Sequence, residues 1–134
     1  LETIASKNKT IKYLGLISPM EAREEMQHSS LLVNPRPTNE EYTKYSCPSK
    51  TLEYLSTGVP VLTTRLEGIP EEYWDYMLTI DDETPTGIAI ALERTFKLSM
   101  EERRKLGEKA KKYILSNKNY ITQTERLLDF IDNL

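Results

Sequence analysis

The sequence predicts an α/β domain in which a parallel sheet carries helices on both faces. Short apolar runs typical of buried strands alternate along the chain with segments of helical periodicity, which is the pattern of βαβ units. One of these runs is apolar without interruption, as in parallel strands that are covered on both sides. At 134 residues, the chain has the length of one domain with a core of its own.

Composition narrows the class of protein. Hydrophobic residues make up 38% and charged residues 29% of the chain, as in ordinary globular proteins. A formal net charge of −3 gives no bulk attraction to nucleic acid, so no nucleic-acid partner is expected. The single cysteine, Cys47, excludes an internal disulfide and fits a reducing cytoplasm, and no cluster of His, Cys or Asp has the spacing of a metal site. No apolar run approaches the roughly 20 residues that span a bilayer.

An apolar run and a capping signal define the first two elements. Residues 11–17 are largely apolar and predict a buried strand. Ser18 follows, with Glu21 three residues later, which is the spacing of a capping box at a helix N-terminus. We therefore expect a helix over residues 19–28, and its few apolar side chains place it mostly in solvent.

The central segment is predicted to be strand, loop, helix and strand. Continuous apolar residues predict strands over residues 30–34 and 59–63. Two prolines and many polar residues make residues 35–46 a long loop, and loops of that length in compact domains are often functional. Pro48 suits the first position of a helix that runs to Thr57, and a glycine follows the end of this helix.

The rest of the chain is predicted to be mainly helical. A turn at Gly68 comes first, and this glycine is interpreted as one that needs a positive φ, with close approach of a ligand as the second interpretation. Capping signals and apolar periodicity define the later elements, which are a short helix at 71–74, a strand at 77–80, and helices at 85–97, 100–115 and 120–134. Tyr73, Trp74 and Tyr76 are expected to pack at the sheet edge, and the alternative is that they face a sugar ring or a further domain.

The helix at residues 48–57 carries the clearest chemical signal. Its N-terminus offers free N–H groups and a partial positive charge, which bind phosphate well. The amides of Ser49, Lys50 and Thr51 are expected to donate to phosphate oxygens, and the Lys50 ammonium adds a mobile positive charge. Glu53 lies about 7.5 Å along the helix axis from its start, where a carboxylate can accept both hydroxyls of a ribose diol. This spacing predicts a nucleoside diphosphate site, with a plain exposed Lys50–Glu53 ion pair as the alternative.

Other residues at the predicted carboxyl edge of the sheet add to this expectation. Ligands of such sheets bind outside the carboxyl ends of the strands, and the loops after Ile17, Asn34 and Thr63 all emerge there. Arg36 lies in one of these loops, where it either reaches a phosphate or anchors the loop. His28, the only histidine, is expected to be structural or exposed.

The segment from Pro48 to Val61, followed by Gly68-Ile69-Pro70-Glu71, resembles the GT-B glycosyltransferases of family 4. Members of that family carry Glu-Ala/Tyr-Met/Leu-Ala-x-Gly-x-Pro-Val and then a Gly-Gly-x-x-Glu-like loop. The resemblance covers residues 11–80 well and the C-terminal helices loosely. It implies a Rossmann-like parallel sheet flanked by helices, with residues 1–134 as part of the C-terminal, nucleotide-sugar-binding domain of the GT-B fold.

The resemblance also implies what the site binds. The family's glutamate that corresponds to Glu53 binds the donor ribose, and the segment corresponding to residues 47–51 lies at the diphosphate. Eight residues before this glutamate the family usually has an acidic residue near the donor sugar, whereas this chain has Tyr45. Glu40 or Glu41 is the alternative acid from the same loop. The nucleoside-diphosphate sugar is itself a substrate, so no cofactor is expected.

A transferase of this family needs a second domain. Its basic diphosphate ligands, acceptor site and catalytic residue lie upstream of the matching segment, so this chain alone is expected to be inactive and no catalytic residue is assigned. The resemblance implies retaining transfer of a sugar to a glycan or lipid-linked acceptor, in bacterial capsular or exopolysaccharide biosynthesis. A cytoplasmic location with peripheral contact at the inner face of the membrane is expected. The alternatives are another Rossmann-like nucleotide binder, which would lack the usual Gly-x-Gly-x-x-Gly, and a non-enzymatic interaction module.

Overall fold

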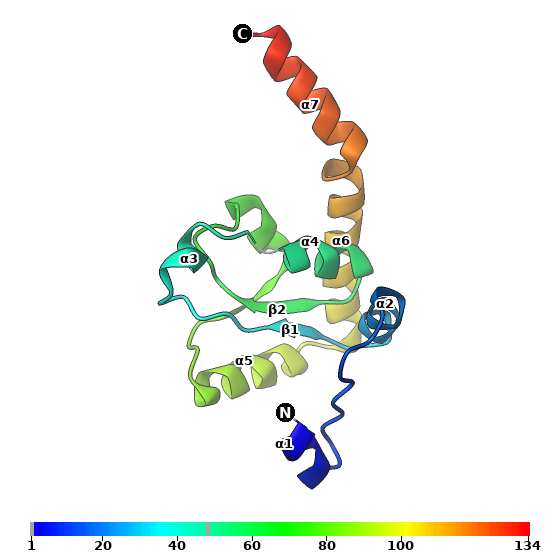
Figure 1. Ribbon diagram of the computed structural model, residues 1–134, viewed down its shortest axis with the longest axis vertical. Coiled ribbons are helices and arrows are strands. Elements are labelled where there is room, and N and C mark those ends of the chain that lie inside the picture. Colours follow the sequence, from blue (N-terminus) through cyan, green and yellow to red (C-terminus); the bar gives the residue numbers. More distant parts are fainter. Residues whose placement is uncertain (1, 48) are drawn as a thin grey trace.

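A parallel sheet forms the centre of the molecule (Figure 1). The computed structural model describes residues 2–47 and 49–134. Within these residues the sheet has three strands in the order β1 (Leu32–Asn34), β2 (Val61–Thr64) and β3 (Leu78–Ile80). All neighbouring strands are parallel, with Leu62 of β2 opposite Val33 on one side and Leu78 on the other. The predicted α/β, Rossmann-like fold class is confirmed.

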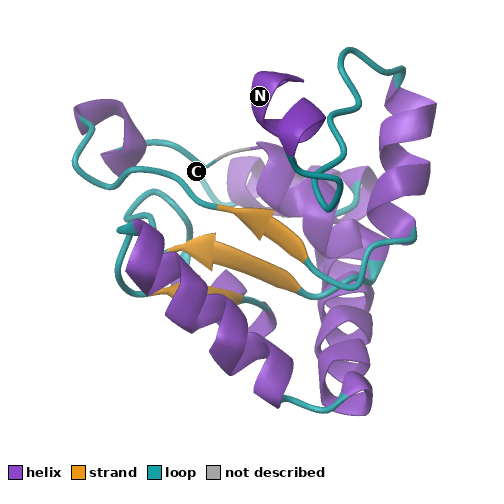
Figure 2. Cartoon of the chain, turned by 90° about the horizontal axis from the view of Figure 1, so that it is seen from below, coloured by secondary structure: helices purple, strands orange, loops and turns teal. Residues whose placement is uncertain are grey.

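Helices cover both faces of this sheet (Figures 1 and 2). On one face lie α4 (Ser49–Thr57), α6 (Met100–Asn117) and the short 3-10 helix η1 (Glu71–Tyr76). On the other face lies α5 (Pro85–Lys97), which packs against β3. Beside α4 lies α2 (Pro19–Gln27), so the helix that carries the predicted site contacts both α6 and α2.

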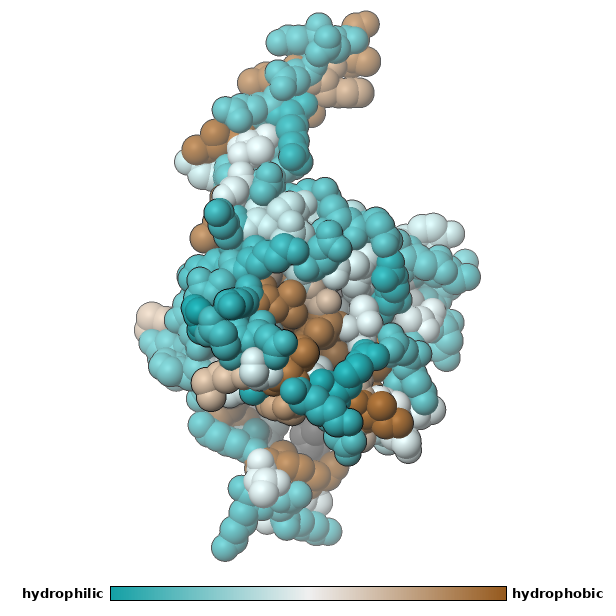
Figure 3. All heavy atoms as spheres, turned by 180° about the vertical axis from the view of Figure 1, so that it is seen from behind, coloured by the Kyte–Doolittle hydropathy of each residue, from teal (hydrophilic) through white to brown (hydrophobic). Residues whose placement is uncertain are grey.

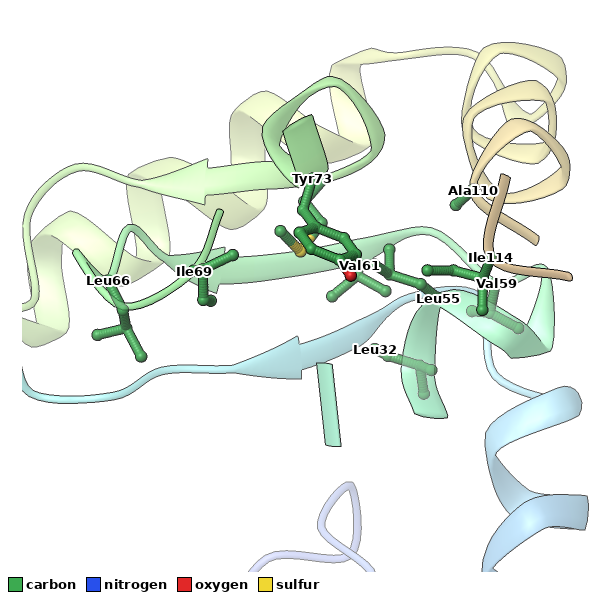
Figure 4. Close-up of a cluster of buried hydrophobic side chains, with 10 residues drawn as sticks. Leu32, Leu55, Val59, Val61, Leu66, Ile69, Tyr73, Ala110 and Ile114 are labelled. Atoms are coloured by element: carbon green, nitrogen blue, oxygen red, sulfur yellow. The ribbon is translucent and has the colours of Figure 1, made fainter. Parts of the chain in front are cut away.

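The core is divided by the sheet into two clusters. Leu55 of α4 is fully buried at the centre of the larger one (Figure 4), whose members are Leu32, Leu55, Val59, Val61, Leu66, Ile69, Tyr73, Met77, Ala110 and Ile114. The smaller cluster, under α5, contains Leu62, Ile80 and Ala91. Full burial of one large apolar side chain stabilises a fold by about 1.5–3 kcal/mol, so the larger cluster fixes α4 firmly against the sheet.

Helices at both ends of the chain extend from this body. The first, α1 (Glu2–Lys7), is joined to α2 by an exposed segment, and the last, α7 (Tyr120–Asp132), projects beyond the end of α6 (Figure 1). No residue of α7 is buried. Its apolar side chains, coloured brown at the top of Figure 3, lie in solvent, and Phe130 is 63% exposed.

Residues 11–17 do not form the predicted strand. They lie between α1 and α2, where residues 11–16 are exposed and Ile17 is half-buried, and the side chain of Leu16 lies entirely in solvent. An apolar run becomes a strand only where a neighbouring strand pairs with its backbone, and in the described structure β1 pairs with β2 alone. Gly15, with a φ of 66°, also interrupts the extended conformation.

The predicted loop at residues 35–46 contains one turn of helix, α3 (Glu41–Lys44). This turn forms because the Thr43 hydroxyl is buried and donates to the Glu40 carbonyl oxygen. The remaining predicted elements are confirmed with shifts of a few residues at their ends. The aromatic packing is confirmed as well, since Tyr73 is buried and the ring of Tyr76 stacks on that of Tyr113 with their centroids 4.3 Å apart.

Candidate functional site

The helix α4 presents two different faces. Thr51 and Leu55, one turn apart, point inward and are 3% and 0% exposed. Ser49, Lys50 and Glu53 lie on the exposed side. At the end of the helix Gly58 adopts a φ of 88°, which confirms the predicted glycine stop, while the predicted first residue, Pro48, lies outside the described residues. The helix therefore presents its first turn and one carboxylate to solvent.

Groups in the first turn of α4 are open to a ligand. The first four N–H groups of a helix have no acceptor within the helix, so the amides of Ser49, Lys50 and Thr51 are available as donors. Burial of the Thr51 side chain leaves only its amide for this role. In the described part of the chain, neither Lys50 nor Glu53 takes part in an ion pair. The ion pair of Lys50 with Glu53 is therefore not formed in this conformation of the described residues.

The loop after β2 supports the turn that precedes α4. A Cβ atom added to Gly68 would lie 2.6 Å from both the backbone nitrogen and the carbonyl oxygen of Ser46, so only glycine allows this approach. The predicted positive φ at Gly68 is wrong, because the glycines with positive φ among the described residues are Gly15 and Gly58. The two motifs noted in the sequence thus form one structural unit, in which the second supports the start of the first.

The loop between β1 and α4 is tied to the end of β2. The Thr64 hydroxyl accepts a hydrogen bond from the Arg36 amide (2.6 Å) and donates one to the Arg36 carbonyl oxygen (2.8 Å). The Thr63 hydroxyl donates to the Asn34 carbonyl oxygen (2.9 Å). The backbone of Arg36 therefore anchors the loop, whereas its buried Nε has no hydrogen-bond partner among the described residues.

A hollow of about 390 Å³ lies at the carboxyl ends of β2 and β3. We call it the carboxyl-edge hollow, and its lining residues are Thr38, Thr43, Lys44, Thr64, Arg65, Leu66, Glu67, Ile80, Asp81 and Glu83. The sequence-based candidates for the sugar contact, Glu41 and Tyr45, are exposed on α3 and at its C-terminal end, and they do not line the hollow. Lys44, between them, does.

Charged side chains at the carboxyl-edge hollow were missed by the sequence analysis. Three of them follow strands: Arg65 comes directly after β2, Asp81 comes directly after β3, and Glu83 lies two residues beyond Asp81. The rule that ligands bind at the carboxyl ends of strands was a signal that could have pointed to them. Lys44 and Glu67 carried no such signal, because their positions depend on how the loops fold.

Hydrogen bonds hold most of these charged groups in place. The Arg94 guanidinium and then the Thr79 hydroxyl donate to the Asp81 carboxylate and lower its pKa. Both carboxylate oxygens of Glu83 accept from the Thr38 amide at 3.1 Å. Arg65 is paired with Glu71 and lies over the Trp74 ring. The walls of the hollow are therefore ordered before any ligand arrives.

A second charged cluster lies between η1 and the end of α6. The Lys118 ammonium pairs with the Glu72 carboxylate and lies over the rings of Tyr73 and Tyr113. Hydrogen bonds from Lys118 and Tyr113 lower the pKa of Glu72, and the bond to Glu72 raises the pKa of Lys118. This cluster packs η1 against α6. His28, as expected, is exposed, and its Nδ1 lies 2.8 Å from the Glu24 carbonyl oxygen.

Comparison with known protein families gives a match over most of the chain. A family model described as glycosyl transferase-like matches residues 3–129, from α1 into α7. The match therefore extends over the whole fold and is not confined to the α4 motif. No curated protein and no solved structure matches the chain. None of the helices in the described residues combines the length and the apolar character that a membrane crossing requires.

Proposed function

The chain belongs to the glycosyl transferase-like family, and we propose that it binds the nucleoside-diphosphate sugar donor of a sugar transferase. The observation that carries this proposal is the arrangement on α4. Ser49 and Lys50 are exposed in its first turn, and Glu53, a turn further along, is exposed without an ion-pair partner among the described residues. These groups match the anionic and the hydroxyl-bearing parts of a nucleoside diphosphate.

In the proposed complex the diphosphate lies on the first turn of α4. The amides of Ser49, Lys50 and Thr51 donate to its oxygens, and the helix dipole and the Lys50 ammonium supply positive potential. Glu53 accepts the two ribose hydroxyls. The nucleoside diphosphate is the leaving group of the transfer, so positive potential fixed at this position stabilises the charge that develops as the sugar leaves.

The finer parts of this proposal rest on the resemblance to GT-B enzymes of family 4. The chain is part of a donor-binding domain, and the partner domain supplies the acceptor site and the catalytic group, so the chain alone is inactive. Transfer proceeds with retention to a glycan or lipid-linked acceptor, and the product is a bacterial capsular or exopolysaccharide. The enzyme works in the cytoplasm with peripheral membrane contact. Tyr45 or Glu41 contacts the donor sugar.

Calorimetric titration of the chain with UDP, GDP and ADP tests this proposal. We expect one of them to bind and Glu53→Ala to raise its Kd by roughly 10- to 100-fold, because hydrogen bonds to a charged group contribute about 1.5–3 kcal/mol. Glu93→Ala is the matched control, since Glu93 is an exposed glutamate of α5 on the opposite face of the sheet. Binding of none of the three, or equal losses in both variants, would contradict the proposal.

A further inference from the structure

Another hollow, of about 280 Å³, lies at the amino ends of β1 and β2. We call it the amino-edge hollow, and its lining includes Ser30, Val59, Pro60, Met100, Arg103 and Arg104. These residues come from the turn after α2, the turn after α4 and the start of α6, which meet at the end of the sheet away from α3 (Figure 1). The hollow therefore lies at the opposite end of α4 from the proposed diphosphate position.

We propose that the amino-edge hollow binds a small organic carboxylate, with the Arg103 guanidinium as the partner of the carboxylate group. The apolar part of the ligand lies on Val59, Pro60 and Met100. The inference goes beyond the proposed function, because it assigns a further ligand to a different part of the domain. A volume of about 280 Å³ is just below the roughly 300–1,000 Å³ of sites for drug-sized ligands, so it suits a ligand with one ring or one short chain.

Arg103 carries an unpaired charge in this hollow. Its side chain takes part in no ion pair between described residues, and its buried Nε has no hydrogen-bond partner among them. An arginine offers five N–H donors in a planar fork, which holds a carboxylate with two parallel hydrogen bonds. Because a buried polar atom without a partner costs free energy, a ligand that supplies an acceptor there is favoured.

An aromatic contact restricts the Arg103 guanidinium without using its donors. Its Cζ atom lies 4.6 Å from the centroid of the Phe96 ring on α5. A cation over an aromatic ring is attracted by the ring electrons and needs none of its N–H groups as hydrogen-bond donors for this contact. The guanidinium is therefore held near one position, and its donors remain available to a ligand.

The other charges around the hollow do not cancel that of Arg103. None of the described residues that line it is acidic. Arg104 also lines it but is paired, at 3.0 Å, with the carboxylate of Glu101, which lies outside the lining. Lys111 has no ion-pair partner in the described structure, and its Cδ lies 3.2 Å from where a Cβ atom on Gly58 would be. Since Gly58 lines the hollow, a second positive charge is close by, and an anion is favoured over a neutral ligand or a cation.

Carbonyl groups at the ends of α2 and α4 act against an anion, because helix C-termini carry partial negative charge. Hydroxyl groups offset part of this charge. The Ser29 hydroxyl donates to the Glu25 carbonyl oxygen (2.8 Å), and the Thr57 hydroxyl donates to that of Tyr54 (2.7 Å). The full charge of the Arg103 guanidinium therefore sets the sign of the potential in the hollow.

Apolar surface beside Arg103 provides the second contact of the ligand. Val59, 8% exposed, belongs to the larger core cluster, and Pro60 is buried next to it, so this part of the wall is fixed. Met100 is 79% exposed, and its flexible side chain can fold over a bound ring or chain. A carboxylate with an apolar part is therefore expected to bind more tightly than acetate, which has none.

Backbone amide shifts in NMR spectra of the whole chain test the inference, with benzoate and hexanoate as probes. We expect saturable shifts for at least one of them at residues 29–31, 58–59 and 100–104, with a Kd of about 10 mM or less. Benzamide has the ring without the charge, and acetate has the charge without the ring. Each should bind at least about 10-fold more weakly, which corresponds to about 1.4 kcal/mol.

Two substitutions separate the charge of Arg103 from the shape of its fork. Arg103→Gln should raise the Kd about 10-fold or more, or about 1.4 kcal/mol. Arg103→Lys keeps the charge but not the planar fork, so it should raise the Kd by a smaller factor, and it gives the reading if Arg103→Gln does not fold. Arg126→Gln, at an exposed arginine of α7, is the matched control and should leave the Kd unchanged.

Three outcomes would overturn the inference. The first is the absence of saturable shifts at the hollow up to about 100 mM of both probes, a concentration at which even a Kd of about 10 mM gives nearly full occupancy. The second is equal binding of benzoate and benzamide, or a Kd that the Arg103 substitutions leave unchanged. The third is displacement of the carboxylate by the nucleotide that binds best, because the anion would then lie on the first turn of α4. The proposed function fails separately, since nucleotide binding that depends on Glu53 is expected whether or not this hollow takes a carboxylate.

Discussion

Replacement of Gly68 by alanine is expected to displace the turn that precedes α4 and to weaken nucleotide binding. The new Cβ atom would lie 2.6 Å from the Ser46 nitrogen and oxygen, whereas ordinary contacts begin at 3.4 Å, so the two backbones must separate by about 0.8 Å. Overpacking of this size costs about 1–3 kcal/mol of folding stability. The hydrogen-bond donors of a binding site must lie within about 0.5 Å of their productive positions. If the displaced turn moves the amides of Ser49 and Lys50, these amides should lose hydrogen bonds to the diphosphate.

Calorimetry with the nucleotide that binds best measures this effect. We expect Gly68→Ala to raise its Kd by roughly 10- to 100-fold, the loss of one or two hydrogen bonds to a charged group. Gly107→Ala is the matched control, because a Cβ atom there would meet the Gly58 carbonyl oxygen beyond the opposite end of α4. It should lower the melting temperature at least as much and leave the Kd nearly unchanged. If Gly68→Ala binds normally, or both variants lose affinity equally, Gly68 does not position this turn.

Two further perturbations test how the body of the domain is held together. Lys118→Met removes the Lys118–Glu72 ion pair. We expect the resulting loss of unfolding free energy to be largest near neutral pH. The Glu72 pKa lies below its ordinary 4.5 in the folded state. The ionised carboxylate therefore adds to the free energy of unfolding above pH 4.5, and this stabilisation is lost as the pH falls through the pKa of the folded state. The Lys118 pKa is raised above its ordinary 10.5 in the folded state. The ammonium therefore adds to the free energy of unfolding below pH 10.5, and this stabilisation is lost as the pH rises through the pKa of the folded state. Urea unfolding of both proteins from pH 3 to 11 measures the difference, and a difference that does not change with pH would contradict this account. Thr64→Val should lower the free energy of unfolding by about 1–3 kcal/mol, because it leaves the Arg36 amide without its acceptor. The control is Thr10→Val, which replaces an exposed threonine. Equal effects of the two substitutions would show that the hydrogen bond to the Arg36 amide contributes nothing to stability.

Features that depend on near neighbours in the sequence were predicted well. The capping boxes of Ser18 with Glu21 and of Ser99 with Glu102 both form, because each needs only residues three positions apart. The exposure of Glu53 likewise follows from helical periodicity once its helix is placed correctly. Local rules of this kind decide where a helix begins and which side it shows to solvent.

Features that depend on distant partners were predicted less well. Residues 11–17 have the composition of a strand, yet a strand needs a partner for its backbone, and composition does not say whether one is present. Gly68 was assigned a special φ, whereas its role is a close approach to Ser46, more than 20 residues earlier. The carboxyl-edge hollow was missed for the same reason, because its lining comes from three loops that meet only after the sheet has formed.

The position of α4 shows why these distant contacts matter for the proposed site. Beneath its middle, Leu55 is buried in the larger core cluster. Beyond its end, Gly107 of α6 packs against Gly58, and before its start Gly68 packs against Ser46. A helix held at three points cannot tilt or slide without breaking close contacts, so the amides of its first turn are oriented before a ligand arrives. Binding of an anion there therefore requires little movement of the protein. Because its amides and Glu53 are already in place, the helix can hold a diphosphate and a ribose at the same time.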